Sequence, residues 1–385
     1  MPISPVLERQ TIYPFVRLNE AARRVESRGV EVIDFGMGDP REATDPLIRQ
    51  ALVDGLRDRM GYPQAQGLPE LRTAIADWAE RRFGTTLDPD TQVIPTLGSK
   101  EAIFSFPQVV VDLDAGRDTV AYTEPGYPVY ERGALFAGAR PLAVPLRERS
   151  GFLPDLDAID EETWSRLAVF WVNYPNNPTC AIAPLSFYER LAGLAREHGF
   201  VLASDEAYTE LWFEGPPASA LQVADLTNVA VFNTLSKRSS MTGYRSGFVA
   251  GDPALVAALK TFRPTVGTAP QEFVQRASIV AWGDEQHVAE TRERYRRKRS
   301  LFLELFGRKG IRVAGSDATM YLWLEVPPSE PAESSEGFAE RLLEHGILVA
   351  PGSYLGAAGE GYFRVALVPS EEDCARAVAI LEKVL

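Results

Sequence analysis

The stretch that decides the fold is Asn233-Thr-Leu-Ser-Lys-Arg-Ser-Ser-Met-Thr-Gly-Tyr-Arg245. The apolar residues just before it predict a buried strand, so Lys237 follows the carboxyl end of that strand. Thr234, Ser236 and Arg245 flank this lysine with groups that bind phosphate oxygens. A lysine in cationic, desolvated surroundings has a lowered pKa and can form a Schiff base. The string therefore suits a phosphorylated carbonyl compound, although it fits a solvated loop lysine about as well.

A second strand ends in an acid. The string Phe200-Val-Leu-Ala-Ser-Asp-Glu-Ala-Tyr208 places Asp205 at the end of an apolar run. In an open parallel sheet this edge is where ligands bind. A carboxylate there could keep a pyridinium nitrogen protonated, and Tyr208, three residues on, could donate to a ring oxygen. The alternative is an aspartate that caps the following helix.

Two further loops follow predicted strands. Asn177 lies in Asn173-Tyr-Pro-Asn-Asn-Pro-Thr-Cys180, where prolines fix the turn so that an amide can point at a ligand. The alternative is an ordinary Pro-Asn turn. Gly98-Ser-Lys-Glu101 opens a predicted helix, and its backbone N–H groups could cradle a phosphate. This string is weak by itself and does not have P-loop spacing.

Strands and helices alternate through the first two thirds of the chain. The predicted strands, read as buried and parallel, are Gln92–Thr96, Thr119–Tyr122, Leu167–Asn173, Phe200–Ser204, Val229–Thr234 and Ser246–Ala250. The predicted helices are Leu68–Phe83, Ser99–Val111 and Pro184–His198. This order predicts an α/β fold in which helices flank a mostly parallel central sheet, with a large domain over residues 45–263.

The last third predicts a smaller α+β domain. It contains helices at Glu285–Phe306 and Glu371–Val384, strands at Tyr321–Val326 and Tyr362–Val368, and a surface loop at Pro327–Gly337. We expect residues 1–44 to join residues 264–385 in this small domain.

Composition excludes several classes of protein. The 385 residues include 40 Lys and Arg against 53 Asp and Glu, a net charge of −13, with two cysteines and three histidines. A chain this acidic disfavours nucleic acid as a partner, and no metal site is expected from so few scattered histidines and cysteines. No signal peptide and no membrane-spanning run is visible, so we expect a cytoplasmic protein.

Four loops at one sheet edge thus offer a phosphate cradle, an amide, a carboxylate and a lysine with an arginine. Together they suit pyridoxal 5'-phosphate. The sequence resembles the fold-type I, pyridoxal-phosphate-dependent aminotransferases of class I/II over essentially its whole length. The family pattern S-x-S-K-x5-G-x-R is present with Thr234 in first place, SDEAY is intact, and NPxNPTG appears as NYPNNPTC. Cys180 therefore stands in place of a glycine, although a side chain there tolerates positive φ poorly.

The resemblance implies a role for each matching residue. Lys237 would bind the cofactor and carry the proton, Asp205 would pair with the ring nitrogen, and Asn177 and Tyr208 would contact the ring oxygen. The phosphate would be held by Ser99, Lys100, Thr234, Ser236 and Arg245, with Tyr127 stacked on the ring.

The same resemblance implies a substrate site and a homodimer. Arg364, on a predicted strand, would clamp the substrate α-carboxylate, with Asn177 and the backbone of Gly38 close by. The turn Pro351-Gly-Ser-Tyr354 also resembles a family turn near the site. Tyr62 matches the tyrosine that reaches the phosphate in the partner subunit.

Three strings narrow the resemblance. Residues 96–101, 235–252 and 61–72 look most like the N-succinyldiaminopimelate aminotransferases of bacterial lysine and diaminopimelate biosynthesis. The partners would then be N-succinyl-LL-2,6-diaminopimelate and 2-oxoglutarate. Both carry a second carboxylate, for which the candidate cations are Arg17, Arg41, Arg263 and Arg276.

Alternatives stay open at this point. Within pyridoxal-phosphate chemistry they are an aspartate, LL-diaminopimelate or aromatic aminotransferase, or a carbon–sulfur lyase. A non-enzymatic regulator would need a DNA-binding domain ahead of residue 30, where the chain leaves little room. A nicotinamide dehydrogenase is disfavoured because no GxGxxG follows a strand.

Overall fold

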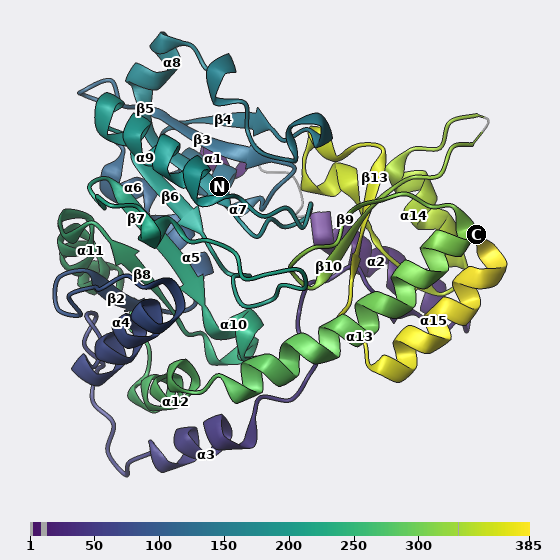
Figure 1. The fold of residues 1–385 in the computed structure, drawn as a ribbon, viewed down its shortest axis with the longest axis horizontal. Coiled ribbons are helices and arrows are strands. Elements are labelled where there is room, and N and C mark those ends of the chain that lie inside the picture. The colour runs from purple at the N-terminus through teal and green to yellow at the C-terminus, as the bar shows by residue number, and fades with distance from the viewer. Residues whose placement is uncertain (1–2, 9–13, 330) are drawn as a thin grey trace.

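The computed structural model describes residues 3–8, 14–329 and 331–385. Its larger part is a seven-stranded sheet with the order β2-β8-β7-β6-β5-β3-β4 (Figure 1). In that order the strands are Val93–Thr96, Gly247–Gly251, Val229–Thr234, Val201–Asp205, Leu167–Asn173, Thr119–Glu124 and Arg140–Pro145. The fold class predicted from the sequence is confirmed, because strands β7, β6, β5, β3 and β4 run parallel and helices flank the sheet.

One predicted strand direction is wrong. Strand β8, predicted as the parallel strand Ser246–Ala250, is antiparallel to both of its neighbours. The residues after Thr234 form only the short helix α10 (Leu235–Arg238) and a 3₁₀ turn, so the chain folds back and Gly247 pairs with Thr234. A parallel return would need a crossover that packs on the sheet.

Strand β4 was not expected from the sequence. It begins Arg-Pro-Leu and ends at Pro145, and it lies at the edge of the sheet. Prolines argue against a central strand but are tolerated at an edge. The predicted helix Ser99–Val111 is in fact two, α5 (Ser99–Ser105) and α6 (Pro107–Val110), and the second begins at a proline.

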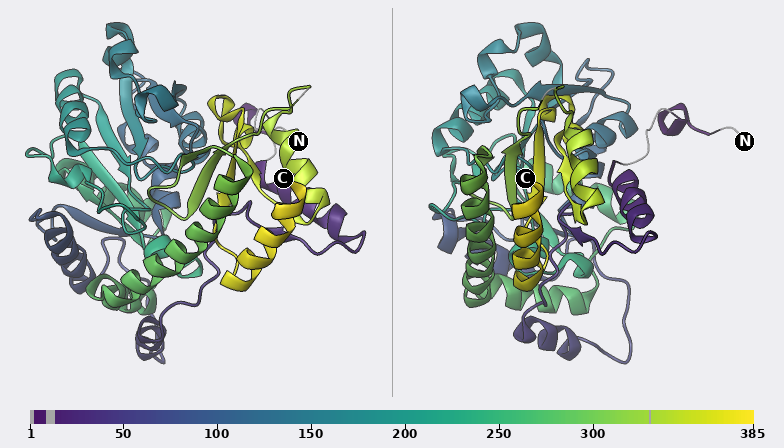
Figure 2. Two further views of the ribbon diagram at one scale, coloured as in Figure 1. Left: turned by 45° about the vertical axis from the view of Figure 1, so that its right-hand side comes forward. Right: turned by 90° about the vertical axis from the view of Figure 1, so that its right-hand side faces the viewer.

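Helices cover both faces of the sheet (Figures 1 and 2). Every residue of β5 is buried, and from Val169 to Val172 its side chains alternate between two apolar clusters. One cluster includes Trp78, Leu191 and Trp282 from helices α4, α9 and α12, and the other takes residues from α5, α7 and α11. The bounds of the helices not yet given are α3 Pro46–Asp54, α4 Pro69–Phe83, α7 Val129–Phe136, α8 Glu161–Arg166, α9 Leu185–His198, α11 Pro253–Val266 and α12 Glu272–Gly283.

The smaller part combines both ends of the chain. Strand β1 (Ile33–Asp34) pairs in parallel with β11 (Ile347–Leu348), and helix α2 (Pro14–Glu26) buries Leu18 against Leu348. A four-stranded antiparallel sheet has the order β12 (Ala350–Pro351), β13 (Tyr362–Ala366), β10 (Tyr321–Glu325) and β9 (Val313–Gly315). Helices α13 (Gln286–Lys309), α14 (Ser335–Glu344) and α15 (Glu371–Val384) complete it. The predicted loop Pro327–Gly337 is therefore too long, because Ser334 caps α14 through the N–H of Gly337.

Helix α12 lies outside the expected large domain of residues 45–263, yet it packs on helices α3 and α4. Its Trp282 contacts Trp78 with ring centroids 4.7 Å apart. We therefore propose that the large domain extends to residue 283 and that α13 begins the C-terminal part of the small one.

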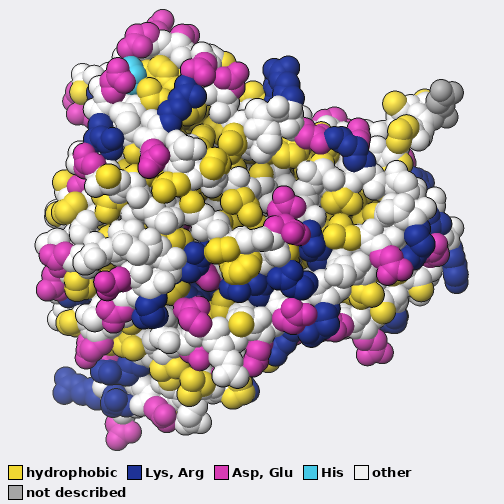
Figure 3. All heavy atoms as spheres, viewed as in Figure 1, with side chains coloured by type: hydrophobic (Ala, Val, Ile, Leu, Met, Phe, Trp, Pro, Cys, Tyr) yellow, Lys and Arg dark blue, Asp and Glu magenta, His cyan; other side chains and the backbone are white. Residues whose placement is uncertain are grey.

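The outer surface carries charges of both signs. Figure 3 shows acidic and basic side chains interspersed over the face in view. Many form exposed ion pairs, such as Arg297 with Glu371 at 2.6 Å, which contribute little to stability. Helix α1 (Pro5–Glu8) stands away from the main body in Figure 2 and has no buried residue. Within residues 3–8, 14–329 and 331–385, no helix has the length and apolar character needed to cross a membrane.

The aromatic core between β5 and α7 gives the first prediction. Trp171 is fully buried, stacks on Tyr130 and contacts Phe232. We expect Trp171→Ala to lower the free energy of unfolding by about 3–5 kcal/mol, because it opens a large cavity. Urea unfolding followed by circular dichroism measures this loss. Leu113→Ala, at an exposed position, should change it by less than about 0.5 kcal/mol, and an equal loss for both variants would contradict the assignment.

Candidate active site

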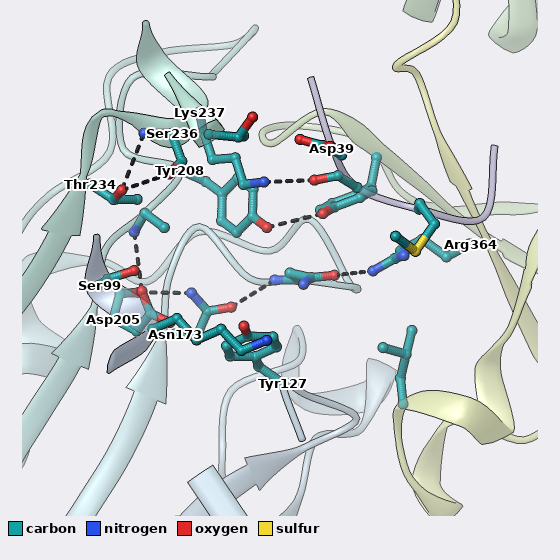
Figure 4. Close-up of a pocket in the computed structure, with 18 of the residues that line it drawn as sticks. Asp39, Ser99, Tyr127, Asn173, Asp205, Tyr208, Thr234, Ser236, Lys237 and Arg364 are labelled. Atoms are coloured by element: carbon teal, nitrogen blue, oxygen red, sulfur yellow. Dashed lines mark hydrogen bonds between the residues drawn. The ribbon is translucent and has the colours of Figure 1, made fainter. Parts of the chain in front are cut away.

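A cavity of about 430 Å³ lies at the carboxyl ends of β5, β6 and β7 and extends to the small domain (Figure 4). Apart from Tyr62 and the arginines considered for a distal carboxylate, all the residues that the sequence assigned to cofactor and substrate line it. They are Gly38, Ser99, Lys100, Tyr127, Asn177, Asp205, Tyr208, Thr234, Ser236, Lys237, Arg245 and Arg364. The lining includes four basic side chains and two acidic ones, Asp39 and Asp205, so an acidic protein gathers cations here.

Lys237 reaches into the middle of the cavity from helix α10. Its Nζ donates to the carbonyl oxygen of Gly38 at 2.6 Å. Burial is the main cause that lowers the pKa of this amine to about 8; Arg364 and Arg245 act in the same direction, and the carboxylates of Asp39 and Asp205 oppose them. A much larger fraction of the amine is therefore neutral at physiological pH than for an ordinary lysine.

Asp205 is the last residue of β6 and is buried. Its Oδ2 accepts a hydrogen bond from the hydroxyl of Tyr130 at 2.7 Å, and its Oδ1 accepts a longer one from the N–H of Ala207 at 3.3 Å. Burial raises the pKa of this carboxyl to about 6, against the effect of these donors and of Lys237. The side-chain amide of Asn173 fixes the strand end by donating to the carbonyl oxygen of Asp205 at 2.7 Å.

Hydroxyl groups and a guanidinium define one end of the cavity. The Thr234 hydroxyl donates to Ser246 O at 2.9 Å and lies 2.9 Å from Ser236 Oγ. Arg245 is anchored by the carbonyl of Thr242 at 2.7 Å. Gly98, just before Ser99, has a φ of 73°, and a Cβ there would lie 2.6 Å from the Arg245 guanidinium. Glycine at this position therefore allows the arginine to approach the turn that carries Ser99.

Arg364 and Asn177 define the opposite end. The Arg364 guanidinium donates to Asn177 Oδ1 and to the carbonyl oxygen of Gly36, each at 2.7 Å, and lies 4.3 Å from the centre of the Tyr321 ring. The Tyr321 hydroxyl is also 3.0 Å from that of Tyr208. A Cβ on Gly38 would fall 1.9 Å from the Tyr321 oxygen, so this phenol requires glycine at position 38.

Four residues at or behind the cavity wall were given no role from the sequence: Asp39, Tyr130, Asn173 and Tyr321. The first three lie inside or beside motifs that the sequence singled out, so their proximity was available. Tyr321 had no local signal, because β10 reaches the site only through pairing with β13.

The substitution of Cys180 for glycine is accommodated. Cys180 has a φ of 62° and is buried. Its thiol lies 3.2 Å from the carbonyl oxygen of Tyr321, and the hydroxyl of Thr319 donates to its sulfur at 3.4 Å. The backbone at Cys180 thus adopts the left-handed conformation expected of glycine, which is strained for a residue with a side chain. The two contacts of the sulfur hold the side chain in place.

The arginines expected at a distal carboxylate do not line the cavity. Arg41 pairs with Asp34 at 2.7 Å, Arg263 with Glu101 at 2.8 Å and Arg276 with Glu272 at 2.6 Å. Arg17 is exposed on helix α2 and lines a separate groove against α14. None of the four therefore lines this cavity within the described chain, and a role for any of them at a distal carboxylate stays a prediction. Tyr62 is fully exposed and also lies outside the cavity.

Comparison with known proteins assigns the family. Residues 30–381 match the family described as aminotransferase class I and II. An LL-diaminopimelate aminotransferase from Aquifex aeolicus is 41% identical over 365 residues, which cover 93% of each chain. An aminotransferase from Neisseria meningitidis is 36% identical, with a TM-score of 0.91 over 100% of both chains. A probable N-succinyldiaminopimelate aminotransferase from Thermus thermophilus is 31% identical, with a TM-score of 0.88 over 96% of this chain and 100% of the other.

The chain therefore belongs to the class I and II aminotransferases, which have the fold-type I architecture. It is a pyridoxal-phosphate-dependent transaminase. The residues present fit the cofactor, because the cavity offers an anion-binding end at Arg245, an amine at Lys237 and a buried carboxylate at Asp205. Because Gly98 has no side chain, the Arg245 guanidinium can lie close to the turn that carries Ser99, and the two can bind the same anion.

The lowered pKa of Lys237 predicts how the apoprotein captures its cofactor. Only the neutral amine attacks an aldehyde, so the capture rate should rise with pH, with a midpoint near 8, and level off above it. Stopped-flow absorbance after mixing with pyridoxal phosphate measures this rate. Lys237→Ala serves as the control and should show no such rise. A midpoint near 10.5, the ordinary lysine pKa, would mean that the amine is not desolvated.

Proposed function

We propose that this aminotransferase moves an amino group between LL-diaminopimelate and 2-oxoglutarate. The first support comes from the relatives: the Aquifex aeolicus protein, which is 41% identical, is named LL-diaminopimelate aminotransferase. The cavity supplies the second support. Both donors carry a distal carboxylate, but free diaminopimelate also carries a distal ammonium, whereas an N-succinyl group removes that positive charge and adds a further carboxylate. The cavity offers the carboxylate of Asp39, which suits an ammonium group.

N-succinyl-LL-2,6-diaminopimelate, the donor inferred from the sequence strings, remains the second candidate. The likeness to the Thermus thermophilus structure favours it. The cytoplasmic location expected from the sequence also stays a prediction.

Each part of the cavity has a role in this proposal. Arg364, which is held by Asn177 and the carbonyl oxygen of Gly36, would bind the substrate α-carboxylate through its planar guanidinium, with Gly38 close by. Lys237 would remove the proton from the substrate Cα as a general base and carry it. Bound pyridoxal phosphate supplies the electron sink for the negative charge at Cα.

The cofactor is held by the remaining residues. Asp205 would pair with the ring nitrogen, Tyr208 and Asn177 would contact the ring oxygen, and Tyr127 would stack on the ring; all four line the cavity. The phosphate would be held by Ser99, Lys100, Thr234, Ser236 and Arg245.

We also propose a homodimer with shared sites. A groove of about 820 Å³ adjoins the cavity, with which it shares Lys100 and Arg245. Its walls include Phe104 and Phe262, so it combines an apolar lining with a cationic floor. A tyrosine from a second copy suits this chemistry, and Tyr62 is fully exposed. Tyr62 of the partner subunit would reach the phosphate through this groove.

A donor panel tests the proposed substrate. With 2-oxoglutarate as acceptor, LL-diaminopimelate should give a kcat/KM at least about tenfold above N-succinyl-LL-2,6-diaminopimelate, aspartate and aromatic amino acids. Asp39→Asn should lower kcat/KM for the free diamine more than for the succinylated donor, because its effect on the pKa of Lys237 is common to both donors. Preference for the succinylated donor would replace the first candidate with the second. Pyruvate release from cystathionine would favour a carbon–sulfur lyase instead.

Mixing two defective variants tests the shared site. Tyr62→Ala and Lys237→Ala should each have little activity alone. A hybrid dimer has one site with both an intact Lys237 and an intact Tyr62 from its partner. Half of the reassociated dimers are hybrids, so mixing should restore about a quarter of the wild-type activity. Recovery of no more than the summed activities would contradict a shared site.

A further inference from the structure

We propose that Tyr130 is a positioning residue. It orients Asp205 and keeps the proton between Asp205 and the cofactor on the cofactor's ring nitrogen. The inference rests on this chain's Tyr130–Asp205 contact and on the binding of pyridoxal phosphate, and it holds for any amino donor. Tyr130 does not line the cavity, so its action passes through the carboxylate of Asp205.

Packing fixes the Tyr130 ring. It is fully buried at the start of α7 and stacks on Trp171 with centroids 5.2 Å apart and an interplanar angle of 18°. Its edge contacts Tyr127, whose ring lines the cavity, at 5.8 Å. The hydroxyl therefore points at Asp205 Oδ2 with little freedom to turn away, and at 2.7 Å it is the shorter of the two bonds to this carboxylate.

The direction of the proton follows from the charges around Asp205. Burial alone makes its carboxylate a stronger base, because the charged form loses its hydration. The Tyr130 hydroxyl offsets this by donating to the carboxylate, as do the Ala207 N–H and the charge of Lys237. Glu206 and Tyr208 are the other titratable groups that interact with it.

Tyr130 is suited to act as a permanent donor. Burial and the neighbouring Asp205 raise the pKa of its phenol well above the ordinary value, so it stays protonated at every pH at which the enzyme works. When the Asp205 carboxylate accepts this hydrogen bond, it is a weaker base than the ring nitrogen of the cofactor. The proton therefore rests on the ring nitrogen. Without this hydrogen bond the proton moves toward the carboxyl, and the ring becomes a poorer electron sink.

The chain offers a matched pair of substitutions. Tyr130→Phe keeps the stacked ring and removes only the hydroxyl. Tyr295→Phe is the control, since Tyr295 is equally buried on α13 and its hydroxyl has no hydrogen-bond partner within the part of the chain that the structure describes.

The direct readout is the ¹⁵N chemical shift of ring-labelled pyridoxal phosphate bound to each variant. Wild type and Tyr295→Phe should show a protonated ring nitrogen, and Tyr130→Phe should shift toward the unprotonated value. Its kcat should fall about tenfold with a smaller change in KM. A cofactor analogue with C–H in place of the ring nitrogen should bind wild type and Tyr130→Phe equally. An unchanged ¹⁵N shift in Tyr130→Phe, or an equal change in Tyr295→Phe, would overturn the proposal.

A second measurement tests the proposal without Tyr130→Phe, in case that variant fails to fold. With 3-fluorotyrosine placed only at position 130, the ¹⁹F shift of the apoprotein should titrate near pH 6, where Asp205 gains its proton. Adding pyridoxal phosphate should abolish this titration, because the carboxylate then stays ionised beside the ring nitrogen. A ¹⁹F shift that does not change between pH 5 and 8 in the apoprotein would overturn the proposal.

Discussion

The register of three parallel strands is the constraint on which the rest of the site depends. Asn173 at the end of β5 pairs with Asp205 at the end of β6, and β7 ends beside them at Thr234. Asp205 pairs with Phe232, so β7 runs two residues beyond it, and three loops leave the same edge of the sheet, each carrying a different chemical group. A slip of one residue would turn Asp205 to the opposite face of the sheet and remove the carboxylate from the cavity.

That arrangement places charged groups where water is scarce. The same burial gives the two groups central to the chemistry unusual proton affinities, a lower pKa for Lys237 and a higher one for Asp205. Each is held by one short contact from another element, Gly38 for the amine and Tyr130 for the carboxylate. The small domain closes the site from the other side with Arg364 and Tyr321, so neither domain alone contains a complete site.

The sequence predicted the parts of the site that follow directly from an apolar run. Asp205, Asn177 and Lys237 each lie within a few residues of a strand end, so local pattern located them. It did not predict the direction of β8, because apolar composition does not encode direction, nor the edge strand β4, whose prolines disguise it. Contacts made across the chain were also missed, such as Tyr321 against Tyr208. The ion pairs of Arg41, Arg263 and Arg276 could not be predicted either, since they form only in the folded chain.

The central claim is that Lys237 is the residue that binds pyridoxal phosphate covalently. Borohydride reduction of the holoenzyme, followed by peptide mass spectrometry, tests it most directly. The account predicts a single pyridoxyl adduct on Lys237 and none in Lys237→Ala. Lys100 is the other lysine that lines the described cavity. An adduct on Lys100 in the wild-type protein, or full trapping in Lys237→Ala, would contradict the account.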